Sequence, residues 1–532
     1  GDHRDLHSFP TRRSSDLRWA GKSRISAGTL CVQGLIWLDP ALIADYDLAF
    51  ERCDFDTAEY GVTKMKSETA SLAQFVADLQ FSRLPQDVVE RTRLLVLDHV
   101  GIALRARHAA ALNSAMSDSL DALGLSGGDA VVIGDERGYS PAAAAFYNGN
   151  LAHSLDFDDT HARGSIHPSA PIVPAALAAA EMTGVDGQRI VAGIVAGYEV
   201  QIRLSIALNP TEHYNRGFHP TATCGVFGAA AAAGSILGLT TDQIVSAFGL
   251  CGSQAAGSMQ FLVDGAWNKP FHVGYAAMGG LMSAVMASKG FIGTKESLEG
   301  TKGGFLKAYA PDADPTEVIA GLGEAYETMN IAVKPYPSCR YGHAAIDALI
   351  AIRAANDVDY RAVEAIEVGL PRTGWNLIGD PESEKQNPKN YVDGQFSMAF
   401  VGAVAIREGR MGWDDYETHL DDQDTLALCK KIKAVVDDRA EAHYPTNMSG
   451  VARVDIGGNS FEQMVVDPKG EPNNFLSDAE MRGKFNTLVA PYFDPDSLDQ
   501  LAKRILQLDD QKNIHGLLDL TRARPATTLK AV

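Results

Sequence analysis

A series of helical patterns rich in alanine and glycine is the strongest constraint on how this chain can fold. Apolar residues recur with helical spacing in four segments, 170–182, 190–208, 222–237 and 243–259. Small residues occupy several faces of these segments, so the helices can approach one another closely and bury most of their surface. Ser67 and Pro85 open further helical patterns. The sequence therefore predicts a mostly α protein with a large all-helical domain.

The pattern changes after Pro335. A helical segment over 344–356 precedes a predicted strand over 365–368. Segments 451–456 and 461–466 alternate apolar and polar residues around a Gly-Gly-Asn turn, which is typical of a β-hairpin. Helical spacing returns after Ser477. We therefore expect a helical domain over 65–334, a smaller α+β lid domain over 335–465, and C-terminal helices over 466–532 that pack on the helical domain.

Residues 1–64 differ from the rest of the chain because they lack the periodicity of a core segment. The segment 7–17 resembles a translated sequencing adapter. An organellar transit peptide is the alternative, since arginine and serine are enriched there, but the acidic stretch 39–59 argues against it. We expect residues 1–64 to be a non-native or disordered extension, with Met65 as the natural start.

The net charge and the placement of the cysteines exclude several classes of partner and cofactor. The formal net charge of −20 disfavours nucleic acid and anionic membranes as partners. The sequence has no apolar run long enough to predict a membrane span. Its six cysteines are scattered without a Cys-x-x-Cys pair, which is typical of reduced thiols rather than disulfides, zinc sites or iron–sulfur clusters. We expect a cytoplasmic protein that binds neither nucleic acid nor membrane.

Four polar clusters interrupt the apolar patterns at helix boundaries, over 155–169, 218–220, 268–272 and 333–343. They supply carboxylates, imidazoles and cations. Removing a proton next to a carboxylate needs a base, cations for the charge that develops on oxygen, and an acid for any leaving hydroxyl. The candidate acids and bases are Asp156, His167 and His219, and the candidate carboxylate-binding cations are Lys269, Lys334 and Arg340.

Each of these residues also has a simpler interpretation. A histidine before proline is often a core or turn residue, and Lys269 taken alone is typical of a solvated loop. The aspartate block 156–159 could bind Mg²⁺ for diphosphate chemistry, but no second aspartate-rich helix accompanies it. The spacing of His153, His161 and His167 matches no standard zinc motif. We therefore predict an enzyme site without a metal.

Together the clusters resemble the MmgE/PrpD family, which contains 2-methylcitrate dehydratase, cis-aconitate decarboxylase and iminodisuccinate epimerase. The matching motifs are Asp-Phe-Asp-Asp-Thr with His-Pro-Ser, Phe-His-Pro, Lys-Pro-Phe-His and Lys-Pro-Tyr-Pro, and the resemblance runs from about Glu68 to the C-terminal helices. It implies a site in the cleft between the helical and lid domains, a homodimer, and no metal or organic cofactor. The catalytic residues that it implies are Asp156, Thr160, His167, His219, Lys269 and Lys334, with Arg340 and His343 as substrate-binding residues.

Two positions depart from the family pattern. Phe400 stands where some members have a functional tyrosine, and His161 stands where the decarboxylase branch has tryptophan. Both departures weigh against cis-aconitate decarboxylation. We therefore predict a cofactor-independent carbon–oxygen lyase for a small di- or tricarboxylate, with dehydration of 2-methylcitrate or a related hydroxy acid as the reaction. Decarboxylation or epimerisation is the alternative, and a non-catalytic helical scaffold is a more remote one.

Overall fold

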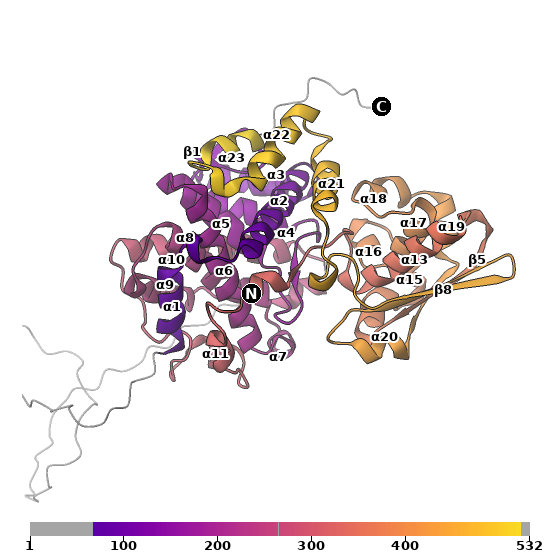
Figure 1. Ribbon diagram of the computed structural model, residues 1–532, viewed down its shortest axis with the longest axis horizontal. Coiled ribbons are helices and arrows are strands. Elements are labelled where there is room, and N and C mark those ends of the chain that lie inside the picture. Colours follow the sequence, from indigo (N-terminus) through magenta and orange to yellow (C-terminus); the bar gives the residue numbers. More distant parts are fainter. Residues whose placement is uncertain (1–66, 264, 523–532) are drawn as a thin grey trace, which may run out of the picture. The chain divides into compact units, whose positions relative to one another are not determined.

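The computed structural model describes residues 67–263 and 265–522, and the predicted N-terminal extension lies outside these residues. The described chain is mostly α, as predicted (Figure 1). The first helices are α1 (Glu68–Asp78), α2 (Gln86–Ala109), α3 (Asn113–Ala122), α4 (Pro141–His153), α5 (Ser169–Thr183), α6 (Gly187–Ala207), α7 (Pro210–Asn215), α8 (Pro220–Ile236), α9 (Thr241–Cys251), α10 (Asn268–Ser288), α11 (Phe305–Tyr309) and α12 (Thr316–Ile319). Four short strands lie among or just after them, β1 (Ser126–Val131), β2 (Gly138–Tyr139), β3 (Thr160–His161) and β4 (Ile331–Ala332).

The spacing of apolar residues predicts three of the central helices, α5, α6 and α8, to within a few residues. The fourth pattern, 243–259, is wrong at its end because α9 stops at Cys251. The start of α9 is a capping box, in which Thr240 accepts from the Gln243 backbone and the Gln243 side chain accepts from the Thr240 backbone. Helix α6 is long and apolar enough to span a membrane, but its apolar window is fully buried inside the protein, as in a core helix.

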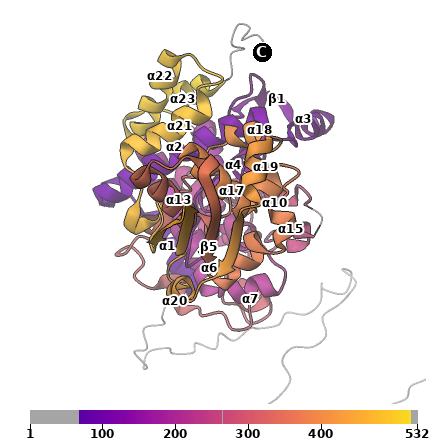
Figure 2. The same cartoon turned by 90° about the vertical axis from the view of Figure 1, so that its right-hand side faces the viewer.

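The second part of the chain surrounds a four-stranded sheet. Its strands are β5 (Val363–Leu370), β6 (Ile432–Val436), β7 (Gly450–Ile456) and β8 (Asn459–Val465), in the order β6-β5-β7-β8. Strand β6 pairs parallel to β5, and the other neighbours are antiparallel. The helices are α13 (His343–Asn356), α14 (Arg372–Gly374), α15 (Glu382–Lys385), α16 (Tyr391–Gln395), α17 (Met398–Glu408), α18 (Asp414–His419), α19 (Gln423–Cys429) and α20 (Asp438–His443). Helices α13 and α17 pack against the sheet (Figure 2).

The hairpin β7–β8 turns at Gly457 and Gly458, which have φ of 56° and 78°. Glycine adopts these left-handed angles without steric cost, and such a turn suits the twist of the strands. This part of the chain has its own hydrophobic core, separate from the core of the helical part. Its function as a lid stays a prediction.

Three C-terminal helices, α21 (Asp478–Val489), α22 (Pro495–Leu506) and α23 (His515–Thr521), follow the sheet. Phe485 and Leu488 of α21 belong to the core of the helical part, and the Phe485 ring lies against Gly101 of α2. The last segments of the chain therefore complete the core that the first helices begin.

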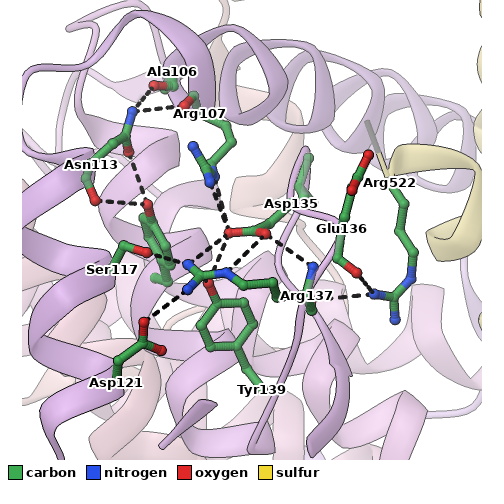
Figure 3. Close-up of polar contacts among 12 residues, drawn as sticks. Ala106, Arg107, Asn113, Ser117, Asp121, Asp135, Glu136, Arg137, Tyr139 and Arg522 are labelled. Atoms are coloured by element: carbon green, nitrogen blue, oxygen red, sulfur yellow. Dashed lines mark hydrogen bonds and ion pairs between the residues drawn. The ribbon is translucent and has the colours of Figure 1, made fainter. Parts of the chain in front are cut away.

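A polar network around Asp135 adds to this closure (Figure 3). The Asp135 carboxylate accepts hydrogen bonds from Arg107, Arg137 and Tyr139. Burial would raise the pKa of this carboxyl, but these bonds lower it to about 2. Arg522, which follows α23, donates to the backbone oxygens of Glu136 and Arg137. The network thus ties the end of the described chain to α2 and to the β1–β2 connection.

Small residues set the distance between helices α4, α8 and α10, which pack closely. A Cβ added to Gly149 of α4 would lie 2.8 Å from the Cα of Gly274 in α10. A Cβ at Gly274 would overlap with the backbone oxygen of Phe146. Because Lys269 and His272 both lie in the first turns of α10, this close approach fixes two polar side chains relative to α4.

We expect Gly274→Ala to lower the free energy of unfolding by about 1–3 kcal/mol, because overpacking forces the backbone to shift. Gly483→Ala is the matched control, since Gly483 is helical and has nothing within 4 Å of an added Cβ. The control should leave stability unchanged or raise it by up to about 1 kcal/mol. Urea denaturation checks both variants, and equal midpoints for Gly274→Ala and the wild type would contradict the packing argument.

Candidate active site

The turn between α4 and β3 brings the aspartate block into the interior. Helix α4 ends at His153, and Asp156 then has a φ of 50°, in the left-handed region. Aspartate adopts this conformation more readily than most residues, but it is uncommon. Asp158 and Asp159 of the same turn are almost fully buried. Strained backbone and buried carboxylates together are typical of a functional site.

Asp156 binds two lysines from distant segments. Its Oδ1 lies 2.7 Å from Lys269 Nζ, at the start of α10. Its Oδ2 lies 3.0 Å from Lys334 Nζ, which also donates to the Asp156 backbone oxygen at 2.7 Å. We call these three residues the lysine–aspartate triad. Its formal charge is +1, so it favours an additional anion such as a substrate carboxylate.

The ionisation of the triad follows from its contacts. Burial alone would raise the pKa of Asp156, but Lys269 and Lys334 hold that pKa well below its ordinary value. Burial would lower the pKa of Lys269, but Asp156 raises it above its ordinary value. Asp156 and Lys269 are therefore both charged at neutral pH. Because its pKa is so low, Asp156 is a poor base, and it is better suited to holding the two lysines.

Four histidines lie next to the triad. The rings of His153 and His167 are 4.6 Å apart, and the ring of His219 is 5.8 Å from those of both His153 and His272. Burial lowers the pKa of His153 to about 4 and holds the pKa of His219 well below its ordinary value. Burial also lowers the pKa of His272. These three imidazoles are therefore neutral at neutral pH.

Several buried polar atoms around the triad have no hydrogen-bonding partner among the described residues. Such atoms are rare in folded proteins, and each costs about 1–3 kcal/mol. Their concentration in one place is therefore the strongest geometric indication of a ligand site in the described chain. The atoms are His153 Nε2, Asp158 Oδ1, Thr160 Oγ1, His167 Nδ1, His219 Nδ1, His272 Nδ1 and Ser338 Oγ.

The structure thus brings together six of the residues predicted from the sequence, but not all eight. Arg340 donates from Nε to Glu471 Oε1 at 2.7 Å, and it lines a separate cavity of about 300 Å³ together with His161. His343 is buried and its Nε2 lies 3.2 Å from the Ser338 backbone oxygen, so it holds the chain next to Lys334. A substrate-binding role for Arg340 and His343 stays a prediction.

Phe400 and His161, the two departures from the family pattern, contact residues other than those of the triad. Phe400 is fully buried in the second core, where its ring stacks on Tyr416 at 5.6 Å. His161 accepts a hydrogen bond from the Gly164 backbone, and its Nε2 lies 3.1 Å from Glu327. Both side chains therefore have structural contacts of their own.

Several residues near the triad were not predicted from the sequence. Gln395 donates to the backbone oxygens of Leu155 at 2.6 Å and Pro337 at 3.3 Å, so one amide joins two segments of the site. The Tyr416 hydroxyl donates to the same Pro337 oxygen at 2.7 Å. His272 was visible in the sequence, in the Lys-Pro-Phe-His motif, but its spacing gave no indication of a role.

His153, Asp158 and His167 also form the one described group whose ligand atoms are close enough together to hold a metal ion, all lying within 4.8 Å of one another. Two ligands of a tetrahedral zinc ion lie roughly 3.4 Å apart, given the usual metal–ligand distances. His153 Nδ1 and Asp158 Oδ2 are 2.6 Å apart, which is a hydrogen-bond distance. The geometry thus fits a shared proton better than a metal, although two imidazoles and a carboxylate are chemically competent ligands.

The chain belongs to the MmgE/PrpD family. The N-terminal domain of that family matches residues 70–318, and its C-terminal domain matches residues 336–510. The resemblance seen in the polar clusters is thereby confirmed.

Among curated proteins the chain is similar to several named as decarboxylases. It is 29% identical to a cis-aconitate decarboxylase-like protein of Aspergillus oryzae, over 85% of this chain and 96% of that one. It is 26% identical to a cis-aconitate decarboxylase of Aspergillus terreus, over 85% of this chain and 95% of the relative. The human cis-aconitate decarboxylase is 25% identical over 86% of this chain and 95% of its own length. These comparisons place the chain in a family of lyases.

We expect enzymatic activity to survive exhaustive dialysis against EDTA, because His153 and Asp158 share a hydrogen bond rather than the spacing of metal ligands. Turnover before and after dialysis, with metal content measured by mass spectrometry, checks this. Loss of turnover that Mg²⁺ or Zn²⁺ restores would show that the aspartate block binds a catalytic metal.

Proposed function

We propose that this protein is a cofactor-independent lyase that acts on a small di- or tricarboxylate at the lysine–aspartate triad. The observation that carries the proposal is a partly buried triad of net positive charge beside imidazoles and unpartnered polar atoms. Lys269 is partly exposed, with 26% of its side-chain surface accessible, so it can contact a ligand while it remains paired with Asp156.

Each group in the site has a distinct role in this proposal. Lys269 and Lys334 bind a substrate carboxylate and stabilise the negative charge that develops on its oxygens. Asp156 holds the two ammonium groups in place. His167 transfers the proton, because its side chain is 15% exposed whereas His153 is fully enclosed. A proton-transfer group must reach the substrate before its acidity matters.

Two reactions share this chemistry. In decarboxylation a carbon–carbon bond breaks, carbon dioxide leaves, and the electron pair spreads onto a neighbouring carboxylate before carbon takes up a proton. In dehydration a base removes a proton from the carbon next to a carboxylate, and the electron pair expels hydroxide, which an acid must protonate. The first reaction needs cations for the developing charge and one proton donor, whereas the second needs a base and, in addition, an acid for the leaving hydroxide.

The site is richer in charge-stabilising cations than in acids, which supports decarboxylation of a cis-aconitate-like tricarboxylate. Three of the imidazoles are neutral and therefore weak acids at neutral pH, since burial lowers the pKa of His153, His219 and His272. The names of the relatives support the same reaction. The departures from the family pattern at Phe400 and His161 weigh against this reaction. Dehydration of 2-methylcitrate, predicted from the sequence, is the second candidate.

The test is to incubate the protein with cis-aconitate, citrate and 2-methylcitrate in deuterium oxide and to follow products by NMR. We expect loss of carbon dioxide from cis-aconitate, with deuterium taken up at carbon. Loss of water from 2-methylcitrate alone would support the second candidate, and no reaction or exchange with any acid would contradict the proposed function.

Substitutions of His167 and Lys269 test the roles that we propose for these two residues. His167→Ala should lower kcat by about 10²–10⁴-fold, which is the usual contribution of a positioned proton-transfer group. Lys269→Ala should raise KM and also lower kcat, because the lysine contacts oxygens on which charge develops. The controls are His515→Ala and Lys307→Ala, which alter exposed residues outside the site. Wild-type turnover in both site variants would show that these side chains have no such roles.

We also propose that the protein is a homodimer in which the outer face of α10 contacts the same face of a second copy. Phe271, Met282 and Met286 are exposed by 45%, 43% and 36%, and Tyr275 and Met278 lie between them with helical spacing. This continuous apolar stripe on one helix is typical of an interaction surface. A two-fold contact is the simplest way for one stripe to cover another.

We expect the double variant Met282→Glu and Met286→Glu to sediment as a monomer at concentrations where the wild type is a dimer. The cost of burying carboxylates in an apolar interface is the physical reason. Leu123→Glu is the control, because Leu123 is 70% exposed and lies outside the stripe. A wild type that sediments as a monomer, or a double variant that stays a dimer, would contradict the proposal.

A further inference from the structure

Asp158 lies between two imidazoles of the site. Its carboxylate is buried, with 3% of its side-chain surface exposed. Asp158 Oδ2 is 2.6 Å from His153 Nδ1, a hydrogen-bond distance. The same oxygen is 3.3 Å from His167 Nδ1, at ion-pair distance but without hydrogen-bond geometry. One carboxylate oxygen therefore faces the same ring nitrogen of two histidines.

This arrangement determines which nitrogen of each ring is available to a ligand. An ionised carboxylate only accepts hydrogen bonds, so His153 must carry its proton on Nδ1. Its Nε2 then has a free electron pair, and this atom is buried without a partner among the described residues. His167 Nδ1 lies 3.3 Å from the same oxygen, and the negative charge of Asp158 favours the ring proton of His167 on this nitrogen, which leaves Nε2 for proton transfer.

The other charged groups around Asp158 are already paired. Lys484 of α21 lies 2.6 Å from Asp98 of α2, and its ammonium also donates to the Phe157 backbone oxygen. Asp159 accepts hydrogen bonds from the backbone and hydroxyl of Ser169. Burial raises the pKa of Asp159 to about 8, so this neighbour is uncharged at neutral pH.

Lys269 also lies near Asp158 but is paired with Asp156. Another neighbour is His99 of α2, and it has little positive charge to offer. Burial lowers its pKa to about 3, so it is neutral. Burial would raise the pKa of Asp158 itself, but His153 and His167 hold it well below its ordinary value. Asp158 is therefore a buried carboxylate whose hydrogen bonding and charge are directed to the two imidazoles.

We propose that Asp158 is a positioning residue for the proposed reaction, which orients His153 and His167 and stabilises the positive charge that His167 carries when it holds the transferred proton. This inference rests on the proposed function. In decarboxylation the proton moves from His167 Nε2 to the substrate carbon, and in dehydration it moves from carbon to Nε2. In either direction Asp158 keeps its charge and the Nδ1 proton stays between ring and carboxylate.

Asp158→Asn tests the proposal, because asparagine keeps the shape and one acceptor but loses the charge. We expect kcat to fall by about 10²–10⁴-fold with little change in KM. The pH profile of kcat should also shift to lower pH, since an uncharged neighbour no longer favours the imidazolium of His167. Asp159→Asn is the matched control: it replaces a neutral acid with a neutral amide, and both the rate and the pH profile should stay unchanged.

A second measurement is independent of turnover. NMR of protein labelled with ¹⁵N only in histidine distinguishes protonated from unprotonated ring nitrogens. In the wild type His153 and His167 should carry a proton on Nδ1, and in Asp158→Asn this preference should be lost. Wild-type turnover and pH profile in Asp158→Asn would overturn the inference, as would an unprotonated Nδ1 on either ring of the wild type.

The two measurements also separate this inference from the proposed function. A wild type that converts none of the polycarboxylates contradicts the function, while the ring-nitrogen spectrum still decides whether Asp158 orients the histidines. If Asp158→Asn does not fold, the wild-type spectrum alone decides the orientation.

Discussion

The contact on which the rest of the site depends is the salt bridge of one buried carboxylate with two lysines. Asp156 lies on the turn after α4, Lys269 at the start of α10, and Lys334 just after β4. Removing Asp156 would leave two ammonium groups uncompensated in a region of low dielectric, which is far more costly than losing an exposed ion pair. The triad therefore joins three distant segments and at the same time supplies the charge that a polycarboxylate needs.

Around this contact the protein tolerates local arrangements that most folds avoid. Asp156 has left-handed backbone, and neutral imidazoles are packed against one another with ring nitrogens that have no partner in the described chain. Each of these features lowers stability on its own. They are tolerated because the helices beneath are closely packed, with glycines such as Gly149 and Gly274 allowing α4 and α10 to approach. Stability gained in the helical core offsets strain at the site.

The sequence predicted those parts of the molecule that depend on local patterns. Apolar spacing located α5, α6 and α8, and the glycine pair located the β7–β8 turn. Parallel pairing of β6 with β5 was missed because it depends on contacts between distant segments. The same limit applies to the site. No local pattern reveals that Arg340 bonds to Glu471, or that Gln395 reaches Leu155, 240 residues away.

Lys484 lies near the end of the chain but contacts segments that are synthesised early. Its ammonium lies beneath the aspartate turn, bonded to the Phe157 oxygen 327 residues earlier in the sequence, and α21 fills the groove beside α2. On the ribosome, the early helices emerge long before the helix that covers them. They expose an apolar groove and an uncompensated Asp98 until translation is nearly complete. The core that the first helices begin, and the ion pair of Asp98, are therefore complete only after the last helices have been synthesised and have docked.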